Sequence, residues 1–132
     1  MQFYACKVVI NMFTEDIKKL TKENTNFREV LHTGKHSQIV AMSIPVGEDI
    51  GEETHPEVDQ ILFFVDGNCE EILNGESRNV EKHDVVFVPA GTKHNFKNTG
   101  DKDLKLFTVY APPEHPDGTV HKTKADAQRA EQ

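Results

Sequence analysis

Four polar side chains in the middle of the chain have the types and spacing of metal ligands. Glu53 and His55 are two residues apart, so in an extended strand both side chains point to the same face. Gln60 begins the next apolar run, and His94 lies in a third. Two imidazoles and a carboxylate form a ligand set for one divalent transition metal ion, Fe, Mn, Ni or Zn, with positions left open for a substrate or water. If these strands converge, the four side chains would hold such an ion.

The elements that must position these side chains are short strands. Apolar residues recur on alternate positions, and tight-turn pairs such as Asp66-Gly67 and Asn74-Gly75 separate the runs. The expected strands are 27–31, 38–44, 52–57, 60–65, 69–73, 76–80, 84–88, 92–96 and 104–110. Short strands at roughly ten-residue spacing, with no helix between them, predict an all-β fold, an antiparallel barrel or sandwich.

The two ends of the chain differ from this pattern. Alternating apolar residues over 4–12 predict an edge strand, and Thr14 is the expected N-cap of a short helix that ends in the polar stretch 21–26. Prolines stiffen the tail at 111–132, and its polar part, 122–132, is typical of a frayed end or a loose helix. The tail is either a stiff surface extension or a segment folded over the mouth of the barrel.

Two motifs in the strand region resemble those of the cupins. The first cupin motif runs from a glycine through two histidines and a glutamate to a second glycine, and at these positions the chain has Gly47, Glu53, His55, Gln60 and Gly67. The second motif is matched at the same spacing by Pro89, Gly91, His94 and Asn98. The resemblance implies a double-stranded β-helix, the jelly-roll barrel, with the metal site in its interior. A further resemblance is to small single-domain cupins that often carry a mannose-6-phosphate isomerase-like label, which implies a connection with carbohydrates.

The chain departs from the cupin pattern at three positions. Glu53 stands where the first histidine is usual and Gln60 where the glutamate is usual, so the carboxylate has moved to the other end of the motif. A neutral amide is a weaker ligand than a carboxylate, which predicts looser binding or a different ion. His83 replaces the glycine that opens the second motif, and we assign it a structural role in a chain reversal.

Other interpretations of the same residues remain open. His55 and Glu57 are also two apart, and a ligand set built on them leaves Glu53 outside. The motif spacing from Gly47 and Gly67 favours Glu53. In a third interpretation, the polar residues line a wet barrel mouth that holds no metal.

The whole chain, 1–132, is expected to form one domain, with a barrel core at about 27–110 and the tail at 111–132. Leu62 and Phe64 share the parity of Gln60 and should face the barrel interior, whereas Ile61 and Phe63 face outward. An apolar outer face predicts a cover, either the amino-terminal segment or a second subunit, and we expect a homodimer. The candidate acid/base residues are Glu57, Glu114 and His115, and the candidate walls of a substrate pocket are Phe64, Phe96 and Tyr110.

Charge and cysteine content restrict the partners. Fifteen basic and 22 acidic residues give a net charge of -7, which disfavours nucleic acid and membrane surfaces as partners. Cys6 and Cys69 are expected to be free thiols. The first residues have no basic leader and no small-residue cleavage site, so a cytoplasmic protein is expected.

Three functions fit these observations. The first is a metal-dependent small-molecule enzyme of the sugar isomerase or epimerase type, in which the ion acts as a Lewis acid. The second is a non-haem iron dioxygenase, because two histidines and a carboxylate also describe such centres. The third is a non-catalytic module that binds a small ligand such as a sugar.

Overall fold

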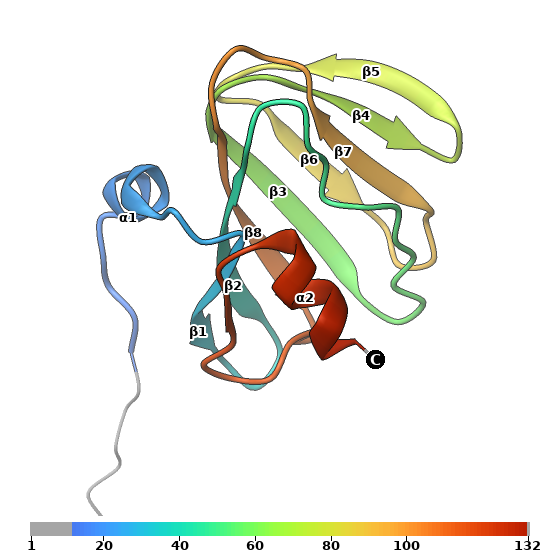
Figure 1. The fold of residues 1–132 in the computed structure, drawn as a ribbon. Helices are drawn as coiled ribbons and strands as arrows, with labels where there is room; N and C mark the ends of the chain where they lie inside the picture. Colours follow the sequence, from blue (N-terminus) through green and yellow to red (C-terminus); the bar gives the residue numbers. More distant parts are fainter. Residues whose placement is uncertain (1–11, 132) are drawn as a thin grey trace, which may run out of the picture.

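The computed structural model describes residues 12–131 of the chain. The strands of these residues form two antiparallel β-sheets, and one helix lies near each end (Figure 1). The helices are α1 (Ile17–Glu23) and α2 (Lys124–Ala130), and the strands are β1 (Arg28–Thr33), β2 (Gln38–Ile44), β3 (Asp59–Asp66), β4 (Cys69–Leu73), β5 (Glu76–Val80), β6 (Val85–Val88), β7 (His94–Asn98), β8 (Leu104–Ala111) and β9 (Val120–His121). The larger sheet has the strand order β6-β3-β8-β2-β1-β9, and the smaller has β5-β4-β7.

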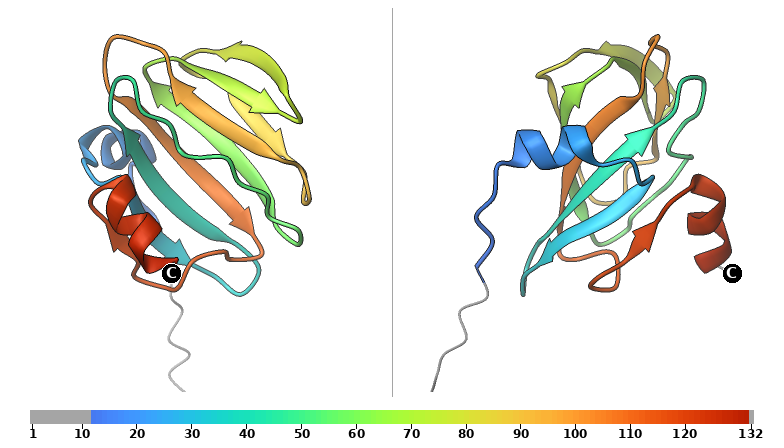
Figure 2. Two further views of the ribbon diagram at one scale, coloured as in Figure 1. Left: turned by 45° about the vertical axis from the view of Figure 1, so that its right-hand side comes forward. Right: turned by 60° about the vertical axis from the view of Figure 1, so that its left-hand side comes forward.

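The two sheets face each other (Figure 2), and the side chains between them form one hydrophobic core. Phe96 and Val80 of the smaller sheet belong to the same buried cluster as Leu62 and Phe64 of the larger sheet. The ring centroids of Phe64 and Phe96 lie 5.7 Å apart. This architecture confirms the predicted all-β jelly-roll with a short amino-terminal helix, and the burial of Leu62 and Phe64 confirms the parity assigned to β3.

The interior changes from apolar to polar along the barrel. The inward residues of β8 are, in order, Leu104, Leu106, Thr108 and Tyr110, and those of β3 are Gln60, Leu62 and Phe64. Because β3 and β8 are antiparallel, Gln60 lies opposite Tyr110, and Phe64 lies opposite Leu106. One end of the barrel is therefore filled with hydrocarbon, while the other is lined with hydrogen-bonding groups.

The segment predicted as a strand at 52–57 is a loop. Only one isolated bridge forms there, between Glu53 and His94, and a turn follows at Pro56 and Glu57. Gly51 has a φ of +107°, a conformation that breaks an extended run, and Pro56 has no backbone N–H to donate to a neighbouring strand. The prediction of a strand was wrong because these two residues interrupt the ladder on both sides of the bridge.

The residue that caps α1 is Asp16, not the predicted Thr14. Its carboxylate accepts a hydrogen bond from the backbone N–H of Lys19 at 3.1 Å, as a short acidic side chain at this position commonly does. The helix packs against the larger sheet, on β8, β3 and β2. The edge strand predicted at 4–12 lies, except for Met12, outside the described residues.

The tail folds back over the open end of the barrel. Strand β9 pairs with β1, and α2 follows with Thr123 as its N-cap and Ala127 buried in the core. The side chain of Gln38 binds the connecting segment, because it donates to the carbonyl of His115 and accepts from the backbone N–H of Glu114 and of His115. Of the two alternatives for the tail, the structure shows the folded one. Within residues 12–131, neither helix has the length and apolar character needed to cross a membrane.

Candidate metal centre

Backbone pairing places two of the predicted ligands side by side. Glu53 and His94 exchange both backbone hydrogen bonds, each 2.9 Å long, across the isolated bridge. His55 follows two residues later, and its Nε2 lies 3.1 Å from Glu53 Oε2. One ligand atom from each of Glu53, His55 and His94 lies within 4.8 Å of the other two. The structure thus brings together a cluster that could hold a divalent metal ion.

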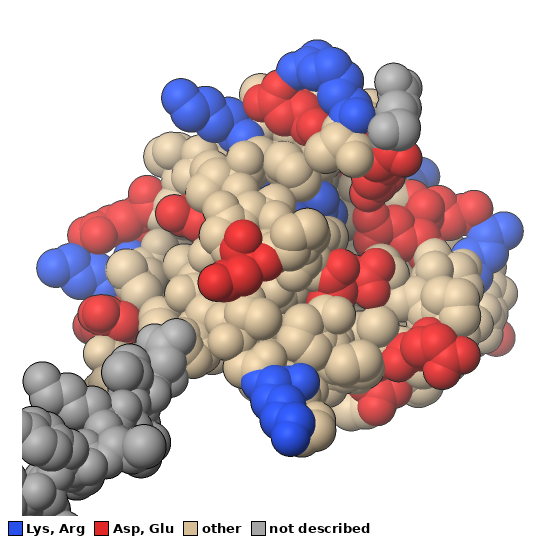
Figure 3. Space-filling model, turned by 90° about the horizontal axis from the view of Figure 1, so that it is seen from below, with Lys and Arg blue, Asp and Glu red and all other residues tan. Residues whose placement is uncertain are grey.

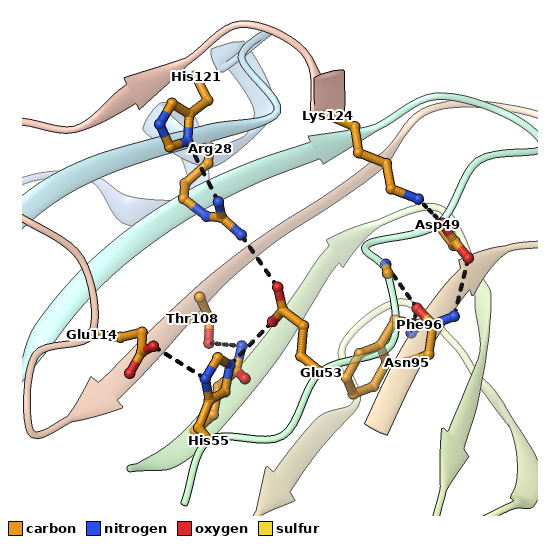
Figure 4. Close-up of polar contacts among 12 residues, drawn as sticks. Arg28, Asp49, Glu53, His55, Asn95, Phe96, Thr108, Glu114, His121 and Lys124 are labelled. Atoms are coloured by element: carbon orange, nitrogen blue, oxygen red, sulfur yellow. Dashed lines mark hydrogen bonds and ion pairs between the residues drawn. The ribbon is translucent and has the colours of Figure 1, made fainter. Parts of the chain in front are cut away.

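Each of the two imidazoles in this cluster is held in place by a polar contact at its Nδ1 atom. His94 Nδ1 lies 2.8 Å from the carbonyl oxygen of Thr92. His55 Nδ1 lies 3.2 Å from Glu114 Oε1, a contact drawn in Figure 4. With Nδ1 donating, the unpartnered Nε2 of His94 is left with a free lone pair. His55 Nε2 instead hydrogen-bonds Glu53 Oε2, and it offers a lone pair to a metal ion once its proton is released. A carbonyl or carboxylate on the second ring nitrogen is the usual support of a metal-binding histidine.

A second observation shows that the residues fit a metal ion: two buried polar atoms of the predicted ligands lack a hydrogen-bond partner among the described residues. His94 Nε2 and Gln60 Oε1 are both buried, and neither has a hydrogen-bond partner in the described part of the chain. Buried polar atoms are rarely left unpaired, and both of these atoms are acceptors that a cation would satisfy. Gln60 Nε2 donates to Thr108 Oγ1 at 3.2 Å and to Tyr110 Oη at 3.3 Å, which fixes the amide in this orientation.

The local electrostatics favour an ionised Glu53 beside neutral His94. Burial acts to raise the pKa of Glu53, but the hydrogen bond and charge of His55 and the charge of Arg28 outweigh it, so the pKa lies below its ordinary value. The hydrogen bond to Glu53 raises the pKa of His55 against the effect of burial. Burial lowers the pKa of His94, which keeps this imidazole in the neutral form that binds metal.

A chain of polar contacts extends from the cluster to the tail in both directions (Figure 4). On one side, Arg28 lies between Glu53 and His121, with its terminal nitrogens 3.9 Å from Glu53 Oε1 and 3.4 Å from His121 Nδ1. On the other side, Glu114 binds His55. We did not predict Arg28 or His121 as site residues. The signal that could have revealed Arg28 is its parity with Val30, which places a cation on the inward face of β1.

The remaining predicted site residues fall into three places. Glu57 is exposed in the turn after Pro56 and lies outside the cluster, which contains Glu53. His115 lies beside Tyr110, with ring centroids 5.1 Å apart, and Tyr110 lies 5.8 Å from His55 by the same measure. Phe64 and Phe96 are buried in the core.

His83 has the structural role that we expected. Its φ is +79°, in the left-handed region that favours glycine, and its N–H donates to the carbonyl of Phe64 at 2.8 Å. The reversal explains why the second motif usually has glycine at this position.

A two-sheet jelly-roll with a histidine- and carboxylate-lined interior defines a class of small β-barrel protein, and the comparisons agree with it. The model of the cupin domain family matches residues 40–110, and the chain belongs to this family. Cupins commonly bind a divalent metal ion. The matched segment contains Glu53, His55 and His94, whereas Arg28, Glu114 and His121 lie outside it.

Among its relatives, the chain is 50% identical over 126 residues to the uncharacterized protein YrkC of Bacillus subtilis, covering 90% of this chain and 67% of that protein. The crystal structure of BH2720 from Bacillus halodurans is similar with a TM-score of 0.89 at 43% identity, covering 92% of this chain and 97% of that one. A predicted oxalate decarboxylase from Thermotoga maritima is similar with a TM-score of 0.57 at 26% identity, over 60% and 69% of the two chains.

Proposed function

We propose that this cupin is a metal-dependent enzyme that acts on a small oxygen-bearing molecule, in a reaction of the sugar isomerase or epimerase type. The observation that carries the proposal is the cluster of Glu53, His55 and His94, in which both imidazoles are supported at Nδ1 and one ligand atom of each residue lies within 4.8 Å of the other two. Glu53, His55 and His94 would hold the ion, and Gln60 would contribute its unpartnered oxygen.

When bound, a divalent ion supplies Lewis-acid stabilisation of negative charge on a substrate oxygen. The chain itself supplies a neutral hydrogen-bonding group, since His115 has a buried Nε2 without a partner among residues 12–131. Burial and the nearby charge of Arg28 lower the pKa of His115 to about 4, so the ring is neutral at pH 7 and would orient a substrate by a hydrogen bond at Nε2. Tyr110 packs edge-on against the rings of both His115 and His55.

A second candidate function is a non-haem iron dioxygenase. Two histidines with one carboxylate are the ligand set of many Fe(II) oxygenases, and the cluster has this composition. The similarity to a predicted oxalate decarboxylase supports chemistry on a small, oxygen-rich molecule in either case. A binding module without chemistry is the third candidate.

Reconstitution of the metal-free protein with Fe, Mn, Ni or Zn distinguishes these functions. We expect incubation with sugars, sugar phosphates or small organic acids in deuterated water to give, for at least one of them, metal-dependent exchange of a hydrogen next to a carbonyl, detected by nuclear magnetic resonance. Oxygen consumption with iron would instead identify the dioxygenase. Ligand binding with neither reaction would identify the binding module, and a protein that takes up none of the four ions would contradict the proposal.

A further inference from the structure

Arg28 is an unusual residue in the interior of this barrel. It is the largest of the fully buried side chains in the described residues, with 2% of its surface exposed. Buried cations are normally paired and hydrogen-bonded, because removing a charge from water is costly. A guanidinium has five N–H donors, yet Nε of Arg28 has no partner among residues 12–131. Its nearest carboxylate oxygen, on Glu53, is 3.9 Å away, beyond hydrogen-bond distance.

The pairing of Arg28 becomes weaker when Glu53 serves as a metal ligand. The carboxylate then shares its charge with the ion, and the other polar groups beside the guanidinium, His121 and Tyr110, bring no negative charge at neutral pH. With neutral histidines, a divalent ion and Arg28 bring three positive charges to the interior, and Glu53 and Glu114 bring two negative charges. These four groups together therefore carry one positive charge, which a monovalent anion would neutralise.

A cleft leads from the surface to this place. Its volume is about 200 Å³, and it lies between α2 and the segment 50–53, with Arg28, Glu53 and Lys124 in its lining. Glu52 and Glu131 also line it, and other Asp and Glu side chains gather on the end of the molecule seen in Figure 3. These acidic groups disfavour a doubly charged phosphate. A carboxylate matches the single excess positive charge, and its two oxygens can accept two parallel hydrogen bonds from the planar guanidinium of an arginine.

We propose that the substrate is a small organic acid whose carboxylate binds Arg28 while a neighbouring hydroxyl or carbonyl oxygen faces the metal cluster. This inference rests on the proposed function and names the substrate class of the same site. Arg28 is then a specificity-determining residue that lies outside the segment matched by the cupin family model.

Glycolate and glycolamide test the proposal because they have the same number of non-hydrogen atoms and differ in charge. Binding of each to the manganese-loaded protein is measured by isothermal titration calorimetry, after free ion has been removed. We expect glycolate to bind at least about tenfold more tightly, the effect of one charge-assisted hydrogen-bonded pair. Equal binding of the two, or no binding of either, would overturn the inference.

Substitution of Arg28 tests its role directly. Arg28→Gln should reduce the ratio of the two affinities to about one, whereas Arg78→Gln, which removes the same charge from an exposed position on β5, should leave the ratio unchanged. Retention of the ratio in Arg28→Gln would contradict the inference. If Arg28→Gln does not fold, the wild-type ratio still decides. Manganese content is measured on the same samples. Loss of the ion from wild-type protein would contradict the proposed function, whereas a retained ion with equal affinities would contradict only the substrate class.

Discussion

Two carboxylates flank the imidazole of His55, and they have different tasks. Glu53 shares the metal cluster, whereas Glu114 contacts Nδ1 from the tail. A carboxylate on the second nitrogen fixes the ring orientation and makes the other nitrogen a better ligand. Glu114 is therefore a positioning residue in this structure, in addition to the acid/base role considered from the sequence.

Glu114→Ala should weaken metal binding by about 10- to 100-fold while the protein stays folded, because His55 loses its support. The measurement is a competition titration with a chelator, with circular dichroism as the check of folding. Glu57→Ala is the matched control, since Glu57 is an exposed acid two residues from His55. Equal metal affinity in Glu114→Ala and the control would show that the tail contact does not support the site.

Glu71 provides a prediction about pH and stability. This buried residue has a carboxylate oxygen without a partner in the described residues, and burial, aided by the charge of Asp84, raises its pKa against the opposing charge of Arg78. Because the folded-state pKa is above the unfolded one, the ionised side chain destabilises the fold at neutral pH. This penalty disappears as the pH falls below the unfolded pKa, where both states are protonated.

Glu71→Gln should therefore raise the free energy of unfolding at pH 7 by about 1 kcal/mol and change it little at about pH 4. Urea unfolding at the two pH values measures this difference. A destabilised variant at pH 7, or an equal gain at both values, would contradict the assignment.

Individual ligands could be predicted because their spacing is local. Glu53, His55 and His94 follow from two short motifs, and the structure brings all three together. Arg28 and His121 could not be paired in the same way, because they are 93 positions apart and meet only after the tail folds back. Their contact depends on the pairing of β9 with β1, which the sequence pattern did not predict.

The strands themselves were predictable because alternation and turn residues are strong local signals. The Asn74-Gly75 turn has positive φ at both residues, at 50° and 84°, as a tight hairpin requires. The loop at 52–57 was not predictable from alternation alone, since Glu53 and His55 keep the spacing of a strand without forming one. Caps and the ends of elements, such as Asp16, depend on which of several polar residues the neighbouring sheet allows.

Alanine substitutions at two glycines with the same backbone conformation distinguish the cost of a steric clash from the cost of backbone strain. Gly67 and Gly75 have φ values of +83° and +84°, but an added Cβ at Gly67 would lie 3.0 Å from the carbonyl oxygen of Asp103, whereas Gly75 faces open space. We expect Gly67→Ala to cost about 1 to 3 kcal/mol more stability than Gly75→Ala, because the strain is shared and only the clash differs. Chemical denaturation of both variants gives the difference. Equal losses would show that the backbone near Asp103 moves aside without cost.

The outer face of the larger sheet is apolar in three neighbouring strands. Register places Val85 opposite Phe63, and Phe63 opposite Phe107, and the last two rings stack with centroids 4.7 Å apart. Val85 and Phe87 are 57% and 54% exposed. We propose that a second copy of the chain covers this face in a homodimer, as expected from the apolar pattern of β3.

Analytical ultracentrifugation should give twice the chain mass of 14.9 kDa. Phe87→Glu should give the monomer mass, because a charge would be buried at the interface. Val46→Glu is the matched control, an exposed apolar residue outside the three strands. A wild-type protein that sediments as a monomer at all concentrations would contradict the dimer.

The polar end of the barrel combines side chains from distant parts of the chain, and we propose that it holds one divalent ion. Metal content tests that claim most directly, measured by mass spectrometry on protein purified without chelators or metal-affinity resin. We expect about one ion per chain in the wild type and in His36→Ala, an exposed histidine, and almost none in His55→Ala or His94→Ala. Unchanged metal content in either of the last two variants would contradict the ligand set.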